Sequence, residues 1–330
     1  MIDLSVIVVT WNTRELALRC LASIEDALAV SDAPRNLSVE TFVVDNGSDD
    51  GTQGAVADAF PGVMIVRLPG NRGFAGGCNA GIRRASGRHV LLLNSDTRVP
   101  PGSLERCVAY LDANPDVGIV GPQLLHPDGS RQNSIHNFPR LATEFVPPIF
   151  FQFLFRRRYP SRRWTGPEPL DVEAVTGAAL FARAELVGEI GGLPEEYFFY
   201  LEETDWCWRA HEAGWRVVYL PDARITHLSG ASSKRVDPAL TRIEFHRSLY
   251  RFYRRNRGSV SEALAILTRF SKTLFYVVCM APLALVRGDR QTRWKVHRRV
   301  LGWHLRGRPD AVGLGQLGAK RDSAESPAIS

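Results

Sequence analysis

Cysteine is scarce in this 330-residue sequence, and no uninterrupted apolar run reaches the roughly 20 residues that a membrane-spanning helix needs. The cysteines are odd in number and lie far apart, so we expect neither a disulfide framework nor a structural zinc site. They are Cys20, Cys78, Cys107, Cys207 and Cys279. The first residues hold no basic stretch, and the apolar run at residues 4–9 is too short for a signal peptide. We therefore expect a reducing, cytoplasmic location.

Charge is unevenly divided along the chain. The sequence is 45% hydrophobic and 23% charged, which is typical of a globular protein, and its net charge is +6. After Gly230 there are 20 basic and 7 acidic residues, a net charge of +13, which leaves −7 on the first 230 residues. This pattern indicates an acidic body with a basic appendage that faces anionic material, either nucleic acid or a membrane surface.

The first hundred residues alternate β-rich runs with helical patterns. The runs at residues 4–9, 39–44, 63–68 and 89–93 read as strands, and residues 16–28, 55–60 and 79–85 read as helices. A glycine-rich loop is expected at residues 71–77. Strands separated by helices predict a parallel α/β sheet, which binds ligands beyond the carboxyl ends of its strands.

The second part of the chain is less regular. It predicts a helix at residues 104–113 and strands at 117–120, 172–182, 215–220 and 224–226. Residues 145–155 are densely apolar and precede three arginines, while residues 274–286 are apolar but interrupted by Pro282. Both stretches fit either membrane contact or internal packing. The last stretch, residues 311–330, is expected to be a disordered tail.

Three polar segments sit where the expected strands end or helices begin. Asp96 follows the strand at residues 89–93, and a carboxylate at that position suits a divalent cation, although a simple Asn/Asp turn is the alternative. Asp45 opens a turn that is common loop chemistry. The glycine-rich segment offers backbone amides to an anion, but it is not the dinucleotide fingerprint, which weakens a dehydrogenase interpretation.

A cluster of acids lies among aromatic residues near the start of a predicted helix. Its carboxylates are Glu202, Glu203 and Asp205. Carboxylates held against apolar rings have raised pKa values, which suits a general base. The alternative is a helix N-terminus enriched in acids because of the helix dipole. The flanking rings are Phe198, Phe199, Tyr200, Trp206 and Trp208.

Seven short segments follow one another along residues 4–232. They read SVIVVTWN, VVDNGSDDGT, NRGFAGG, LLNSD, TGA, FFYLEETD and HLSGAS. In this order they resemble the motifs of the family-two glycosyltransferases of the GT-A fold, especially the rhamnosyltransferase-like branch. The resemblance implies a Rossmann-like nucleotide-binding half and a mixed central sheet with helices on both faces.

The resemblance also implies a role for each matched residue. Glu203 matches the general base, with Glu202 and Asp205 as alternatives. A donor-binding role is implied for Thr10, Trp11, Asn12, Asp45, Asn71, Arg72, Gly73, Asn94 and Ser95. A place in the sugar or acceptor site is implied for Thr176, Gly177 and Ala178.

A divalent metal, Mn²⁺ or Mg²⁺, is the cofactor that the resemblance implies. Asp96 matches the last acid of the metal motif, and His227 matches a late histidine that completes the metal shell. The motif departs from the usual Asp-x-Asp because its first position is Asn94, which removes one carboxylate.

The expected domains are a GT-A catalytic domain at residues 1–232, a basic helical and membrane-associating extension at 233–310, and the tail. The expected activity is inverting transfer of a sugar, L-rhamnose from dTDP-L-rhamnose, to a lipid-linked or saccharide acceptor in cell-wall or surface-polysaccharide synthesis. The enzyme would act on the cytoplasmic face of an anionic membrane. The alternatives are a nucleotidyltransferase on a similar fold and a nucleic-acid-binding protein that uses the basic tail.

Overall fold

A computed structural model of the chain describes residues 1–30, 37–145, 153, 164, 166–228, 237–281 and 288–315. Several sequence predictions therefore lie outside the described residues. These are most of the apolar stretch at 145–155 with its three arginines, residues 282–286 of the second apolar stretch, residues 229–232 of the last motif, and residues 316–330 of the expected tail.

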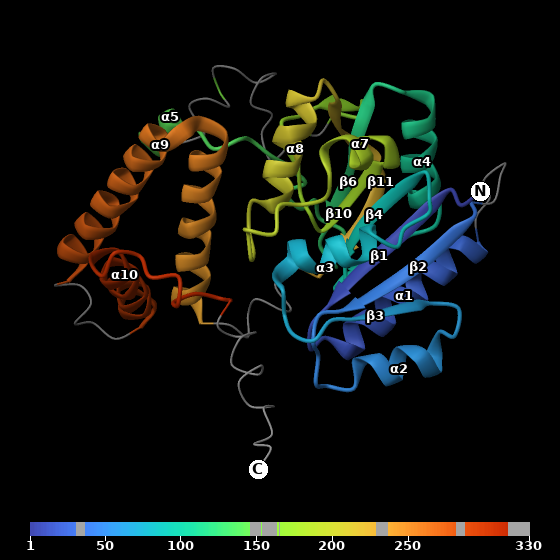
Figure 1. Ribbon diagram of the computed structural model, residues 1–330, viewed down its shortest axis with the longest axis horizontal. Helices are drawn as coiled ribbons and strands as arrows, with labels where there is room; N and C mark the ends of the chain where they lie inside the picture. The colour runs from blue at the N-terminus through green and yellow to red at the C-terminus, as the bar shows by residue number, and fades with distance from the viewer. Residues whose placement is uncertain are drawn as a thin grey trace, which may run out of the picture.

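The described strands form a central nine-stranded sheet with helices on both faces (Figure 1). Its order is β3-β2-β1-β4-β10-β6-β11-β5, and β8 pairs with β11. The bounds are β1 Leu4–Thr10, β2 Val39–Asp45, β3 Met64–Arg67, β4 His89–Asn94, β5 Thr97–Arg98, β6 Val117–Leu125, β8 Leu170–Asp171, β10 Ala179–Arg183 and β11 Arg216–His227. A separate pair joins β7 Ile135–His136 to β9 Ala174–Val175.

The first four strands, β1 to β4, run parallel, as predicted. The sheet becomes mixed at β10, which runs antiparallel to β4 and to β6. The mixed sheet that the resemblance implied is thus confirmed. Parallel pairing brings the carboxyl ends of β1, β2 and β4 to one edge, where a ligand site is expected.

Both faces of the sheet are buried, which explains its continuous apolar strands. In β1, Val6 and Val8 point into a core with α1 and α4, whereas Ile7 points into a second core with α3 and α8. The helices are α1 Arg14–Ala29, α2 Thr52–Ala59, α3 Gly73–Ile82, α4 Ser103–Ala113, α5 Leu141–Phe145, α7 Ala184–Ile190, α8 Glu202–Glu212, α9 Pro238–Met280 and α10 Asp289–Leu305.

Three predicted elements differ from the observed ones. The glycine-rich segment is not a loop, because α3 already begins at Gly73. The strand expected at residues 172–182 is divided between β9 and β10. The two strands expected around Pro221 form the single strand β11, whose register against β6 shifts between Leu220 and Arg224. That irregularity accommodates the proline, which cannot donate a ladder hydrogen bond.

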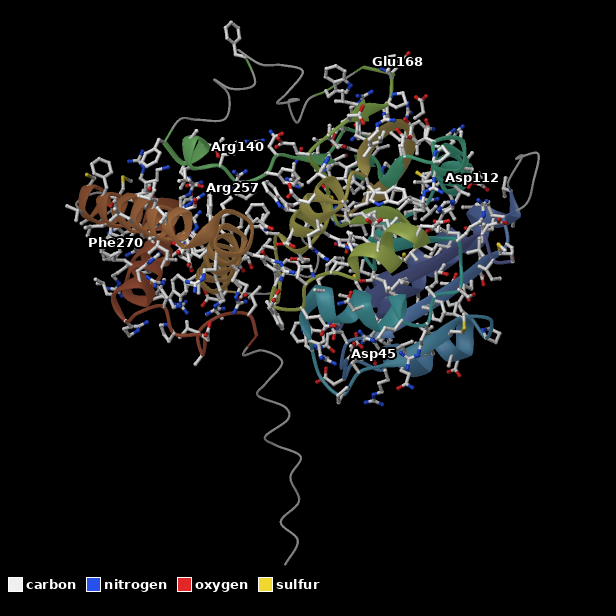
Figure 2. The ribbon with its side chains drawn as sticks, turned by 45° about the horizontal axis from the view of Figure 1, so that its top comes forward. Asp45, Asp112, Arg140, Glu168, Arg257 and Phe270 are labelled. Carbon is white, nitrogen blue, oxygen red and sulfur yellow. The ribbon has the colours of Figure 1, made fainter. Side chains whose placement is uncertain are left out.

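The C-terminal helices stand apart from the sheet (Figure 1). Helix α9 bends at Gly258, whose φ of 82° lies in the left-handed region that favours glycine. Its first arm faces α8, and its second arm packs against α10. Figure 2 shows Asp45 in the sheet body and Phe270 on the second arm, on opposite sides of the molecule. The packed chain extends into the expected tail, because Leu314 is buried.

Candidate active site

The carboxyl ends of three neighbouring strands meet at one edge of the sheet. Thr10 of β1 pairs in register with Asp45 of β2, and Val9 pairs with Asn94 of β4. Side chains link the loops that follow: Thr13 Oγ1 lies 2.8 Å from Thr10 Oγ1 and 3.0 Å from the Oγ of Ser95. The predicted donor-binding residues of β1, β2 and β4 are therefore brought together.

Asn12 fixes the loop after β1 to the loop after β2. Its φ of 53° is left-handed, its backbone N–H donates to Ser48 Oγ at 2.9 Å, and its Oδ1 accepts from Asp49 N at 2.9 Å. Asp45 is itself buried, and its Oδ1 accepts from Ser48 N at 2.8 Å. These contacts hold the predicted nucleotide edge in one conformation.

A buried asparagine, Asn46, shapes the entry to α3. Its Oδ1 accepts from Arg72 N at 2.9 Å, and its Nδ2 donates to Gly73 O at 2.9 Å and to Asn71 Oδ1 at 3.1 Å. Gly73 has a φ of 75°, and a Cβ there would lie 2.3 Å from the carbonyl oxygen of Phe198. Only glycine fits this turn, which therefore lies against the segment that leads into α8.

Asp96 and His227 come together through the pairing of two strand ends. His227 lies opposite Thr97 in the antiparallel β5–β11 pair, and its Nε2 is 3.2 Å from Asp96 Oδ1. Gln132 orients the ring: its Nε2 donates to His227 O at 2.6 Å, and its Oε1 lies 2.9 Å from His227 Nδ1. The amide oxygen accepts the Nδ1 proton, so Nε2 is the ring atom presented to Asp96.

This pair fits a divalent cation as part of a larger donor set. A carboxylate oxygen and an imidazole nitrogen face one another, and the second ring nitrogen is hydrogen-bonded, as is usual for metal-ligating histidine. Within the described residues there is no group of three or more His, Cys, Asp or Glu side chains placed to hold a metal. Two protein ligands would leave positions for diphosphate oxygens, which suit Mg²⁺ and similar ions.

Residues 176–178 lie between Glu203 and the same edge of the sheet. A Cβ at Gly177 would stand 3.4 Å from Glu203 Cβ and Cγ, in ordinary contact. The next residue, Ala178, accepts a hydrogen bond at its carbonyl from Asn94 N at 3.0 Å. The segment at residues 176–178 therefore borders Glu203 on one side and the loop that carries Asp96 on the other.

The two adjacent glutamates differ in their surroundings. Burial raises the pKa of Glu203 to about 7. Burial, and then the charge of Glu203, raises the pKa of Glu202 well above its usual value. Glu202 Oε2 is buried and has no hydrogen-bond partner among the described residues. Burial therefore favours the protonated form of Glu202, whereas Glu203 exchanges a proton in the working range of a general base.

Asp205 is fully enclosed by donors. Tyr197 Oη and Asn256 Nδ2 donate to its Oδ2 at 2.9 and 2.8 Å. Arg209 Nε donates to its Oδ1 at 3.2 Å, and Arg255 Nε is 3.6 Å from the same oxygen. Both carboxylate oxygens are thus engaged, and the residue ties α8 to the first arm of α9. This arrangement argues for a structural role instead of the base.

Replacing Asp205 with Asn is expected to lower the free energy of unfolding by about 3 kcal/mol, measured by chemical denaturation. The value is at the low end for a broken buried ion pair, because Arg209 and Arg255 are 20% and 40% exposed. The exposed Glu212 on the same helix provides the control, and Glu212→Gln is expected to change stability by less than about 0.5 kcal/mol. Equal effects of the two substitutions would contradict the structural role.

The turn before α8 is strained and is held by α9. Tyr200 and Leu201 have φ values of 73° and 67°, an uncommon conformation for residues other than glycine. The buried Ser248 of α9 donates from its Oγ to Phe199 O at 2.8 Å. Strained backbone persists where its surroundings over-determine it and clusters at active sites. The turn delivers Glu202 and Glu203 to the first turn of α8.

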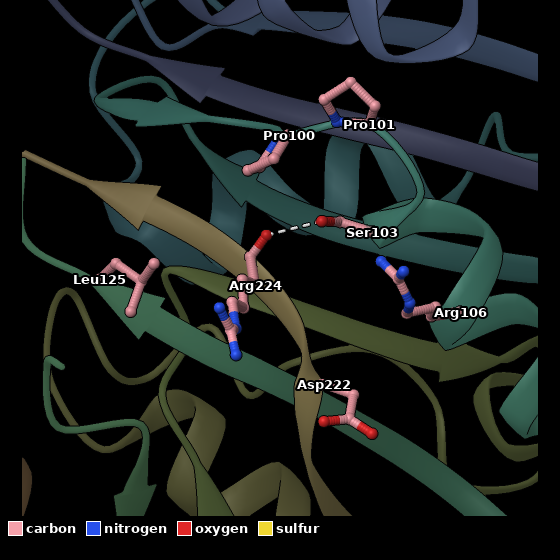
Figure 3. Close-up of a pocket in the computed structure, with 7 residues that line it drawn as sticks. All are labelled: Pro100, Pro101, Ser103, Arg106, Leu125, Asp222 and Arg224. Carbon is pink, nitrogen blue, oxygen red and sulfur yellow. Dashed lines mark hydrogen bonds between the residues drawn. The ribbon is translucent and has the colours of Figure 1, made fainter. Parts of the chain in front are cut away.

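A surface pocket of about 500 Å³ lies elsewhere on the sheet and includes none of the predicted site residues (Figure 3). Ser103 Oγ donates to the carbonyl of Arg224 at 2.7 Å across it. Its lining comprises Pro100, Pro101, Ser103, Arg106, Leu125, Asp222 and Arg224.

Two residues that shape the site were not among those predicted. Asn46 lies within the DNGS segment, where an ordinary Asn-Gly turn accounts for an asparagine. Its position in that motif is the signal in the sequence. Gln132 carries no local signal, because its partner His227 is 95 residues away. Arg72 was predicted, but its guanidinium binds Glu195 at 3.2 Å, so its described contact is to protein.

The sheet order, the polar carboxyl edge and the acid-bearing helix beside it define a GT-A fold. The chain belongs to glycosyl transferase family 2, whose sequence model matches residues 5–175. It is thus a glycosyltransferase. The predicted family is confirmed.

Similar proteins agree with the rhamnosyltransferase-like branch. An N-acetylglucosaminyl-diphospho-decaprenol L-rhamnosyltransferase of Mycobacterium tuberculosis is 29% identical over 268 residues, which cover 76% of this chain and 83% of the relative. The dTDP-rhamnosyl transferase RfbF of Shigella flexneri is 24% identical over 64% of this chain and 67% of its own length.

Among solved structures, the mannosyltransferase PcManGT from Pyrobaculum calidifontis, in complex with GDP-Man and Mn²⁺, aligns with a TM-score of 0.51. The two chains are 21% identical, and the alignment covers 92% of this chain and 86% of the other. This likeness confirms the fold.

Proposed function

We propose that the protein is an inverting, metal-dependent glycosyltransferase that moves L-rhamnose from dTDP-L-rhamnose to a lipid-linked acceptor. The observation that carries the proposal is a carboxylate with a pKa of about 7, Glu203, beside the segment at residues 176–178 that also borders the Asp96 loop. A general base on one side of residues 176–178 and a diphosphate site on the other side suit direct displacement of the nucleoside diphosphate by the acceptor hydroxyl.

Glu203 accepts the proton of the acceptor hydroxyl as that oxygen attacks the anomeric carbon. The bond between this carbon and the diphosphate oxygen breaks, and its electron pair leaves with the nucleoside diphosphate. Attack opposite the leaving group inverts the configuration. A well-placed base contributes about 10²–10⁴-fold to the rate. Residues 176–178 line the space for the sugar or acceptor.

Asp96 and His227 are the proposed ligands of Mn²⁺ or Mg²⁺. Their opposed donor atoms, with Gln132 fixing the imidazole, support this assignment. When bound, such a cation neutralises charge on the departing diphosphate as a Lewis acid. The carboxyl edge formed by Thr10, Asp45 and Asn94 is proposed to bind the nucleoside, with Trp11, Asn12, Ser95 and the Asn71–Gly73 turn beside it.

Rhamnose and the dTDP carrier are proposed because two relatives are named as a rhamnosyltransferase and a dTDP-rhamnosyl transferase. The lipid-linked acceptor is proposed from the diphospho-decaprenol in the name of the first. We propose a cytoplasmic enzyme that meets its acceptor at the cytoplasmic face of an anionic membrane. Within this proposal residues 1–232 form the catalytic domain, and the basic helices at 233–310 form the membrane-associating extension.

The test is a donor screen with Mn²⁺, in which dTDP-L-rhamnose, GDP-mannose and UDP-glucose are offered with a polyprenyl-diphosphate N-acetylglucosamine acceptor. Mass spectrometry is expected to show a rhamnosylated lipid, and released dTDP is expected to match it mole for mole. Transfer from GDP-mannose alone would overturn the donor assignment. Release of pyrophosphate would indicate a nucleotidyltransferase and overturn the reaction type.

A further inference from the structure

The second arm of α9, residues 259–280, exposes a row of large apolar side chains. Val260, Leu267, Phe275 and Val278 are 73%, 60%, 71% and 63% exposed. Leu264 and Leu274, at 43% and 40%, complete the row. At about 100° of rotation per residue, all six positions fall within an arc of about 100° and so lie on one side of the helix. These six residues are called the apolar stripe.

The opposite side of the arm is held by the protein, so the stripe has a fixed outward direction. Trp294 of α10 donates from Nε1 to Val277 O at 2.9 Å, and Tyr276 stacks on His297 with ring centroids 4.0 Å apart. Arg269 Nε lies 2.8 Å from Glu144 Oε2 on α5. Turning the stripe inward would break these contacts.

The residues of the stripe follow one another along one helix face, whereas the exposed apolar residues of an ordinary surface are scattered singly. By length and composition α9 could cross a membrane, and only 17% of its most apolar window is buried. A spanning position is opposed by Arg269 and Lys272, which both bind Glu144 on α5, and by α10, which packs along the arm. The arm therefore suits a position along a lipid surface instead of through it.

Helix α10 supplies the charge that such a surface attracts. Over 17 residues it carries five exposed cations and a single acid, Asp289. Cations beside an apolar helix face favour anionic lipid, at about 1 kcal/mol for each Lys or Arg near the surface. The cations are Arg290, Arg293, Lys295, Arg298 and Arg299.

We infer that the apolar stripe is a docking surface for anionic lipid bilayers, which the cations of the neighbouring helix α10 attract over a longer range. The functional purpose of docking depends on the proposed lipid-linked acceptor, because docking would hold the active site near an acceptor in the membrane. The first arm of α9 gives a physical link, because Ser248 and Asn256 contact the turn and helix that carry Glu203. The bent helix α9 thus connects the docking surface to the segment that carries Glu203.

The test is sedimentation of the full chain with phosphatidylcholine vesicles, with and without phosphatidylglycerol, in the absence of any nucleotide sugar. Wild type is expected to bind the anionic vesicles and to be released by salt. The double variant L267S/F275S is expected to bind at least about tenfold more weakly, because two inserted side chains are lost. V30S alters an apolar residue of similar exposure, 63%, at the C-cap of α1, and is expected to bind like wild type.

Lack of wild-type binding, or equal binding by the double variant, would overturn the docking surface. A wild-type dimer that the double variant dissociates, measured by light scattering, would instead assign the stripe to a second copy of the chain. Donor hydrolysis by the double variant is expected to equal that of wild type. Since vesicle binding needs no substrate, its failure is separate from failure of the proposed activity.

Discussion

Replacing Glu203 with Gln is expected to lower kcat by about 10²–10⁴-fold, the contribution of a well-placed general base. The amide preserves shape but cannot accept the acceptor's proton, so binding of the donor is expected to survive within about twofold. Turnover is measured by release of nucleoside diphosphate, and donor affinity by calorimetry. The matched control is Glu202→Gln, which makes the same substitution at the adjacent buried position, where burial favours the protonated acid.

The pH profile gives this prediction a second readout. Burial raises the pKa of Glu203 to about 7, and the base works only when ionised. Wild-type kcat/KM is therefore expected to fall as the pH drops below about 7 and to level off above it. Glu203→Gln should lose this limb, whereas Glu202→Gln should keep it. Near-normal turnover by Glu203→Gln, or collapse in Glu202→Gln alone, would reassign the base.

Replacing Asp96 with Asn is expected to reduce kcat/KM by about 100-fold or more and to raise the Mn²⁺ concentration needed for half-maximal activity. The amide keeps an oxygen near His227 Nε2 but lacks the charge that binds a divalent cation and offsets the diphosphate. Gln132→Ala is expected to lose about 10–100-fold in metal affinity, because it releases the His227 ring without removing a ligand.

Asp222→Asn is the control for this series, because Asp222 is exposed on the same strand as His227. Its activity and metal dependence are expected to match wild type. Full activity of wild type in a strong chelator would refute the metal assignment. A loss in Asp96→Asn that does not depend on the metal concentration would show that Asp96 acts in another way.

The sheet could be predicted from sequence because its strands are buried on both faces. Continuous apolar runs such as β1 and β4 are typical of strands that are covered on both faces of a parallel sheet. The polar residues at their ends mark the ligand edge. Local propensity failed for α3, since glycine is a poor helix former. Its helix is supported by packing, because Gly77 and Gly81 let it lie against Val9 and Ile7.

The acid cluster shows what sequence could not resolve. Glu202, Glu203 and Asp205 are almost adjacent in the chain, but each position on a helix turns by about 100° and meets a different environment. The partner that engages Asp205 from α9, Asn256, is 51 residues away. Their separate environments depend on these long-range contacts, so motif spacing alone left three candidates for the base.

A crystal structure of the Glu203→Gln variant with Mn²⁺ and dTDP-L-rhamnose is the most direct test that one site joins the cation to the proton acceptor. The account predicts Mn²⁺ on Asp96 and His227, diphosphate oxygens on the same ion, and the substituted side chain at position 203 facing the anomeric carbon opposite the leaving oxygen. A donor bound away from Asp96, or a sugar turned away from position 203, would contradict it.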